Sequence, residues 1–256
     1  MDIENQIETI IEKFKRIFSI TDDMASQSEI RTRILDGGQI TGTNMCVLVC
    51  AMIIASVGLN MSSTAVIIGA MLISPLMGTI LASAYANVSA DYPLLRTYLK
   101  GLGLQVAISI IAATIYFFLS PIKDPTTELL ARTSPTFFDV LVAFFGGLAG
   151  IIGQTREDKT NTVIPGVAIA TALMPPLCTC GYSIANGRWD MLLGAGYLFI
   201  INTYFIYISA AMVMGLLKIP KIRELTEREW RMRRFIMIRN IILITIPSII
   251  AVYFML

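Results

Sequence analysis

Few residues in this chain could carry out covalent or metal chemistry. The 256 residues include no histidine, and the four cysteines, Cys46, Cys50, Cys178 and Cys180, all fall inside apolar runs. Cys46 and Cys50 share one helical face and Cys178 and Cys180 lie beside a proline break, but without any histidine in the chain we do not expect a thiolate metal site. The sequence also lacks an obvious pair of acids or a nucleophile with its base. We therefore expect no enzyme activity, no metal and no cofactor.

Two apolar stretches carry a proline break near their middle. They are Gly69–Asn87, with Pro75, and Ala170–Asn186, with Pro175 and Pro176. Proline removes a backbone donor and clashes with the preceding turn, so a buried helix bends or breaks there. In lipid, the freed backbone groups need a partner from protein, water or a ligand. Each break is therefore either packed against protein or lines a cavity.

The two stretches look like copies of one unit. A shift of 99 residues, from Ala86 to Ala185, also aligns polar residues in the same order. Matched Asn, Asp and Tyr are less expected by chance than matched Leu or Ala in a chain that is 55% hydrophobic. We infer an internal duplication. The other matched pairs are Asn87 with Asn186, Asp91 with Asp190, Leu94 with Leu193, Tyr98 with Tyr197 and Leu99 with Leu198.

Apolar helices must position these breaks. A mean hydropathy of +0.70 and 15% charged residues predict an all-α, polytopic helical membrane protein whose partner is the lipid bilayer, not nucleic acid. The acidic and polar first residues predict that no cleavable signal is present. We expect seven transmembrane helices, over residues 44–59, 64–86, 98–119, 135–152, 162–185, 191–217 and 240–256.

Two polar segments flank the crossings. Residues 1–43 are predicted to be a cytoplasmic segment, with an amphipathic helix over 2–18 and a second helix that ends at Gly37. Residues 218–239 form a basic cytoplasmic linker, in which Trp230 lies among arginines. This linker either binds anionic lipid headgroups or only sets the topology.

The connection before the fourth crossing carries several local signals. ELLAR (128–132) is predicted to be a short interfacial helix, because its Glu and Arg are four residues apart. Ser134 and Pro135 should cap and start the fourth crossing. Asp139 follows Thr136 by three residues, and we interpret it as part of an N-terminal capping box in preference to a carboxylate that couples transport to an ion.

Other polar or small residues lie inside the crossings. Asn202, Thr203 and Tyr204 could line a site, but hydrogen bonds between helices explain them equally well. Three glycines of the fourth crossing should permit close helix packing: Gly146, Gly147 and Gly150.

The orientation follows from the distribution of positive charge. With seven crossings, all but three of the 20 Lys and Arg residues fall on one side of the membrane. The exceptions are Lys123, Arg132 and Arg188. Positively charged connections stay in the cytoplasm, so the N-terminus is predicted to be cytoplasmic.

The duplication predicts an inverted repeat. The units 44–119 and 120–217 each hold three crossings, an odd number, so they lie in opposite orientations. The seventh helix, 240–256, falls outside this 3+3 plan and either packs peripherally or contacts a second copy in a homo-oligomer. The two breaks should meet near the midplane, where solute sites form in such folds.

The helix dipoles indicate the sign of a ligand at the breaks. Each half-helix after a break presents its N-terminus, which attracts anions, and the centre of both broken crossings lacks charged residues. An anion or a small polar molecule therefore fits better than a divalent metal. The predicted lining is Ser74, Pro75, Gly78, Thr79, Ser83, Thr171, Pro175, Pro176, Cys178 and Thr179.

Three ordered motifs carry a family resemblance. GAMLISPLMG (69–78), ELLARTSPT (128–136) and PGVAIATALMPPL (165–177) resemble the hallmarks of a prokaryotic membrane family, the uncharacterised hydrophobic domain known as domain of unknown function 389. The resemblance covers about residues 44–217. It implies a multi-pass protein of the prokaryotic plasma membrane, and it implies no substrate.

Together these features favour a membrane transporter or channel for a small solute. The alternative is a membrane sensor or scaffold whose breaks are packing kinks and whose cytoplasmic helices recruit a partner.

Overall fold

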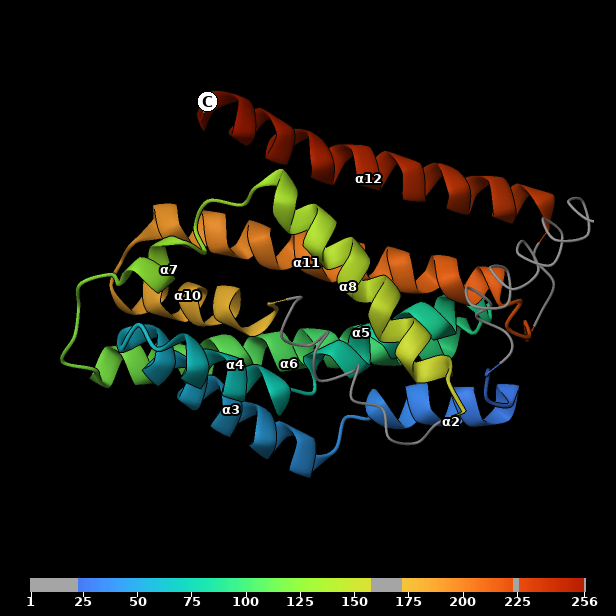
Figure 1. The fold of residues 1–256 in the computed structure, drawn as a ribbon, viewed down its shortest axis with the longest axis horizontal. Coiled ribbons are helices and arrows are strands. Elements are labelled where there is room, and N and C mark those ends of the chain that lie inside the picture. Colours follow the sequence, from blue (N-terminus) through green and yellow to red (C-terminus); the bar gives the residue numbers. More distant parts are fainter. Residues whose placement is uncertain (1–22, 158–171, 223–225, 256) are drawn as a thin grey trace, which may run out of the picture.

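The computed structural model describes residues 23–157, 172–222 and 226–255, and this part of the chain is built from helices without a β-sheet (Figure 1). The predicted helix over 2–18 lies outside it. In chain order the helices are α2 (Gln27–Gly37), α3 (Gly42–Asn60), α4 (Thr64–Leu72), α5 (Leu76–Val88), α6 (Tyr92–Leu119), α7 (Thr127–Leu130), α8 (Phe137–Thr155), α10 (Met174–Ala185), α11 (Trp189–Leu216) and α12 (Glu227–Met255).

Four of these helices are long and apolar enough to cross a membrane: α3, α6, α8 and α11. Together α4 and α5 make a fifth candidate, bent by 45° at their break. The protein is therefore a multi-pass membrane protein with four to five candidate spans in the described part. The predicted total of seven stays a prediction, because crossing five is described only from Ala172 and the last apolar run is the second half of α12.

Several helix ends lie where local chemistry predicted them. Gly38 follows α2 as its C-cap, and α7 forms at ELLAR with Glu128 and Arg132 paired at 3.4 Å. The Asp139 carboxylate accepts a hydrogen bond from the Thr136 backbone N–H at 2.7 Å, which confirms the capping box. These ends are set by side chains a few residues away, which sequence alone can identify.

One predicted helix start was wrong, and one helix extends beyond its predicted crossing. Helix α8 begins at Phe137, not at Pro135, because the Thr136 and Asp139 pair caps it better than Ser134 does. Helix α6 begins at Tyr92, six residues before the expected Tyr98. The Asp91 carboxylate accepts from the Leu94 N–H at 3.1 Å and so caps a helix that extends beyond its apolar run.

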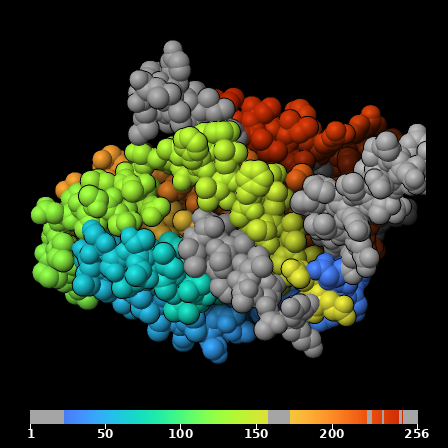
Figure 2. Space-filling model, in the orientation of Figure 1, coloured from blue at the N-terminus to red at the C-terminus, as the bar shows by residue number. Residues whose placement is uncertain are grey.

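The C-terminal segments that sequence separated form one helix, α12, which runs without a break from Glu227 to Met255. It packs mainly against α8 (Figures 1 and 2), and the Tyr204 hydroxyl of α11 donates to the Met237 carbonyl at 3.2 Å. Arg228, Trp230 and Arg231 are exposed on its first half. The lipid and topology interpretations of this basic half both remain.

The core is formed where the short helices pack on the two 28-residue helices, α6 and α11. Helices α5 and α10 each contact both of them. Helix α8 packs closely on α11, since a Cβ added at Gly147 would overlap the Ser209 hydroxyl and lie 2.8 Å from the Ile206 Cα. The predicted role of the glycines in α8 is confirmed at this position.

Helix α2 lies across one end of the bundle and contacts several elements. A Cβ at Gly78 of α5 would overlap the Gly37 carbonyl of α2, and the Tyr98 hydroxyl of α6 donates to the Leu35 carbonyl at 3.2 Å. Ahead of α2, the Ala25 N–H donates to the Thr155 carbonyl at the end of α8 at 2.8 Å. The α2 segment therefore joins α5 and α6 to α8.

Candidate functional site

The first predicted break is confirmed. Helix α4 ends at Leu72 and α5 starts at Leu76, with Pro75 as its N-cap. The Ser74 N–H donates to the Met71 carbonyl at 3.3 Å, and the Ser74 hydroxyl accepts from the Leu76 N–H at 3.4 Å. Ser74 therefore occupies the turn that satisfies the backbone on both sides of the break.

The second break is described from Ala172 onward. Helix α10 starts at Met174 with Pro175 and Pro176 in its first turn. Just before it, Ala172 has φ +39°, an unfavourable left-handed conformation for a residue with a Cβ. The Asn202 amide of α11 donates to the Ala172 carbonyl at 3.3 Å. Asn202 thus makes an interhelical hydrogen bond that supports the strained backbone.

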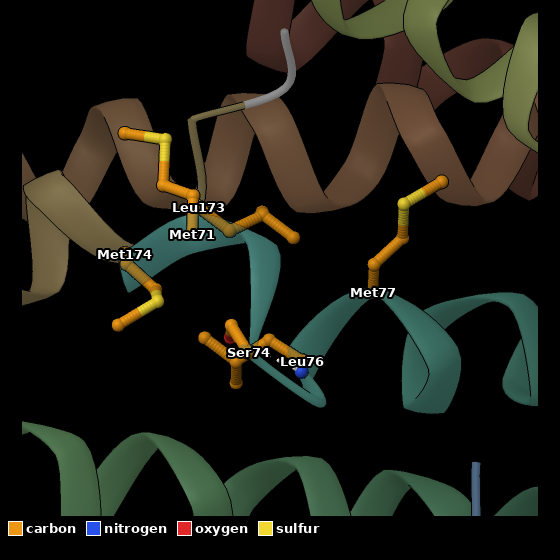
Figure 3. A pocket seen from close by; sticks show the side chains of 6 residues that line it. All are labelled: Met71, Ser74, Leu76, Met77, Leu173 and Met174. Atoms are coloured by element: carbon orange, nitrogen blue, oxygen red, sulfur yellow. Dashed lines mark hydrogen bonds between the residues drawn. The ribbon is translucent and has the colours of Figure 1, made fainter. Parts of the chain in front are cut away.

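The turn between α4 and α5 and the start of α10 meet at one small pocket (Figure 3). Ser74 and Leu76 reach it from the turn between α4 and α5, and Leu173 and Met174 from the start of α10. Its volume of about 10 Å³ is at the lower limit for one water molecule. Apart from the Ser74 hydroxyl the lining is apolar, completed by Met71 and Met77.

The other predicted site residues near the first break lie at the start of α5 or along it, and none of them lines the pocket. Pro75 adjoins it, whereas Gly78 packs against α2. Thr79 and Ser83 are fully buried, and the Ser83 hydroxyl donates to the Thr79 carbonyl at 2.8 Å.

Helix α10 has hydrogen bonds similar to those of α5. Pro175 and Pro176 are buried in the first turn. The Thr179 hydroxyl donates to the Pro175 carbonyl at 2.9 Å, and Ser183 donates to the Thr179 carbonyl at 2.7 Å. The buried Cys178 thiol points to the Met52 carbonyl at 3.8 Å, in α3. Thr171 lies outside the described residues.

The buried polar side chains of the described residues are uncharged. In the described part of the chain, the buried polar residues are Ser, Thr, Asn and Gln, without a buried Asp, Glu, Lys or Arg. A search of the same residues finds no cluster of three metal ligands among His, Cys, Asp and Glu. The four cysteines are free thiols, Cys46 and Cys50 on the surface and Cys178 and Cys180 inside. Hydroxyls, amides and helix N-termini are therefore the groups that could hold a solute.

Sequence reasoning missed Gln105, a fully buried residue in the middle of α6. Neither polar atom of its side-chain amide has a hydrogen-bond partner within the protein. A sequence signal existed, because Gln105 and Asn202 are each the fourteenth residue of a 28-residue helix, α6 and α11. A shift of 99 residues does not align Gln105 with Asn202, so the predicted duplication does not reveal the pair.

The long apolar helices, with one span bent at a break between α4 and α5, define a polytopic α-helical membrane protein. The family described as a domain of unknown function (DUF389) matches residues 71–208, more than half of the chain, and this protein belongs to that family. The match runs from the end of α4 into α11 and includes both proline breaks.

A curated relative extends the comparison. An uncharacterised protein of the archaeon Methanocaldococcus jannaschii is 29% identical over 196 residues, which cover 77% of this chain and 61% of the relative. The chain thus spans less than two thirds of that relative's length. No solved structure matches the chain.

Proposed function

We propose that this protein is a transporter or channel that moves a small solute through the site between its two broken helices. The observation that carries this proposal is the pocket shared by both breaks, to which Ser74 and Leu76 contribute from one side and Leu173 and Met174 from the other. Non-helical backbone at membrane depth is tolerated where it is buried in protein or lines a cavity. In known transporters, paired breaks of this kind hold the solute.

The inverted repeat belongs to this proposal and has support from element lengths. Helices α3 and α8 both have 19 residues, and α6 and α11 both have 28. The half-helices α5 and α10 each pack on both long helices. The uneven distribution of Lys and Arg supports a cytoplasmic N-terminus in a prokaryotic plasma membrane.

The solute class follows from the donors at the breaks. An anion is favoured, because two helix N-termini approach one pocket and the described residues include no buried acid to repel it. The N-termini of α5 and α10 differ in how strongly they should attract an anion. Pro175 and Pro176 remove two backbone donors from the first turn of α10, whereas the first turn of α5 contains no proline. The α5 end is therefore the stronger anion-binding end, and a small neutral polar molecule is the second choice.

Flux into proteoliposomes tests this function. Purified protein should accelerate the movement of nitrate more than that of glycerol, and of glycerol more than that of rubidium. Replacement of Pro75 by Ala should favour a continuous helix and lower the flux, while membrane insertion is unchanged. A wild-type protein that moves none of these probes would rule out the transport proposal for them and favour the sensor or scaffold alternative.

A further inference from the structure

Gln105 is a buried residue whose side-chain amide has no hydrogen-bond partner in the described part of the chain. Its exposed fraction is 0%, and both its amide nitrogen and its amide oxygen lack a partner. A buried carboxamide without hydrogen bonds is costly and uncommon in folded proteins. Such a group in the core of a membrane protein is by default a candidate functional residue.

The contacts along α6 locate Gln105 between the two broken helices. The buried residues of α6 follow one face, on which Tyr98 contacts the α2 and α5 end through Gly38. Further along the same face, Ala113 contacts Gly181 of α10. Gln105 lies between these two contacts. It therefore lies on the buried face of α6 that contacts the α2 and α5 end at Tyr98 and α10 at Ala113.

The depth along the α5 and α6 hairpin agrees with this position. A Cβ at Gly38 would lie against both Ala82 and Tyr98, so these two residues are at the same level. The helices are antiparallel and joined by a short turn at residues 89–91. Ser74 of the pocket lies eight residues before Ala82, and Gln105 lies seven residues after Tyr98. At about 1.5 Å per residue, Ser74 and Gln105 therefore lie at a similar depth.

Asn202 shows what the corresponding amide does in the other half. It lies at the same position of α11, and its amide donates to the Ala172 carbonyl and so supports the second break. Gln105 makes no such bond. One turn further along α6, the Ser109 hydroxyl is also buried without a partner, as is Thr79 on α5. Among the described residues, Gln105 alone leaves two polar side-chain atoms buried and unpaired.

We propose that Gln105 is a solute-binding residue and that its amide N–H groups bind a small monovalent anion. This inference rests on the proposed function and adds a specific residue and a ligand charge to it. The anion carries one charge at most, because the site offers neutral donors and helix ends but no cationic side chain to balance a second charge.

Flux measurements on three variants test the residue and the charge. Gln105→Met keeps the side-chain length and removes the amide, and should lower nitrate flux about tenfold through loss of hydrogen bonds. Gln105→Glu should lower nitrate flux at least as far while it spares glycerol. Ala107→Met is the control, because Ala107 is exposed on the outer side of the same helix. Unchanged nitrate flux in either Gln105 variant would overturn the proposal.

Cysteine labelling gives a second readout that does not depend on transport. In a variant without the four native cysteines, Gln105→Cys should react with a water-soluble anionic methanethiosulfonate, and nitrate should slow the reaction. Ala107→Cys should stay unreactive in the bilayer. An unreactive or unprotected Cys at 105 would overturn the proposal. If the wild type shows no flux but nitrate still protects this position, the transport function fails while the anion site stands.

Discussion

At the residue scale, the core of this protein combines neutral polar groups with interrupted backbone. Ser74 satisfies the turn before α5, and Asn202 holds the Ala172 carbonyl before α10. Sequence predicted the break at Pro75 because proline acts through its own backbone. It did not predict the unpaired amide of Gln105, because the partners of a buried side chain depend on which helices surround it.

A charged residue in place of Ser74 tests the sign of the charge on the solute. Ser74→Asp adds a carboxylate at the start of α5, where it should compete with an anion for the positive helix end. We expect a larger loss of nitrate flux than of glycerol flux, measured in proteoliposomes. Ser74→Asn is the matched uncharged control. An equal loss of both fluxes in the Asp variant would argue for a steric effect instead.

The hydrogen bond between Asn202 and Ala172 predicts a coupled pair of stability changes. Asn202→Leu should destabilise the protein by about 1 kcal/mol, the usual net value of one intramolecular hydrogen bond. Ala172→Gly alone should have a small effect, since glycine tolerates the positive φ. In the Ala172→Gly background, Asn202→Leu should lower the free energy of unfolding by less, because the backbone at residue 172 is then less strained. Thermal unfolding in detergent measures all four proteins, and strictly additive losses would contradict the coupling.

At the element scale, the sequence predicted helices well and their contacts poorly. The apolar runs gave α3, α6, α8 and α11, and the capping box of Thr136 and Asp139 appeared as expected. The first residues of α6 were left out of the predicted crossing because Arg96, in its second turn, interrupts the apolar pattern. The position of α2 against Gly78 could not be predicted, since glycine on an apolar helix does not reveal which backbone approaches it.

That close approach predicts the effect of a side chain at Gly78. Gly78→Val would force its Cβ into the Gly37 carbonyl, and neither backbone can move without displacing its helix. We expect α2 to detach from α5, which limited proteolysis near residue 37 would detect as faster cleavage. Gly103→Val is the control, because no atom lies within 4 Å of a Cβ added there. Equal cleavage of the two variants would show that α2 is held elsewhere.

At the scale of the whole molecule, the arrangement predicts which ends face the same side of the membrane. The turn at Met61 connects α3 and α4, and Glu157 follows α8 near α2. In the seven-crossing topology Met61 is external and Glu157 is cytoplasmic. Single cysteines at these positions, in a variant without native cysteines, should react with an impermeant reagent from opposite sides. Labelling from the same side would overturn the topology and the inverted repeat with it.

The different lengths of the spanning helices have a consequence for the lipid environment. At about 1.5 Å per residue, α6 and α11 are about 42 Å long and α3 and α8 about 28 Å. A hydrocarbon core of about 30 Å leaves the long pair to tilt or protrude while the short pair has little freedom. Longer acyl chains should bring the long helices upright and change their angle to the half-helices packed on them. The space between the breaks would then depend on membrane thickness, and solute flux should vary with acyl chain length.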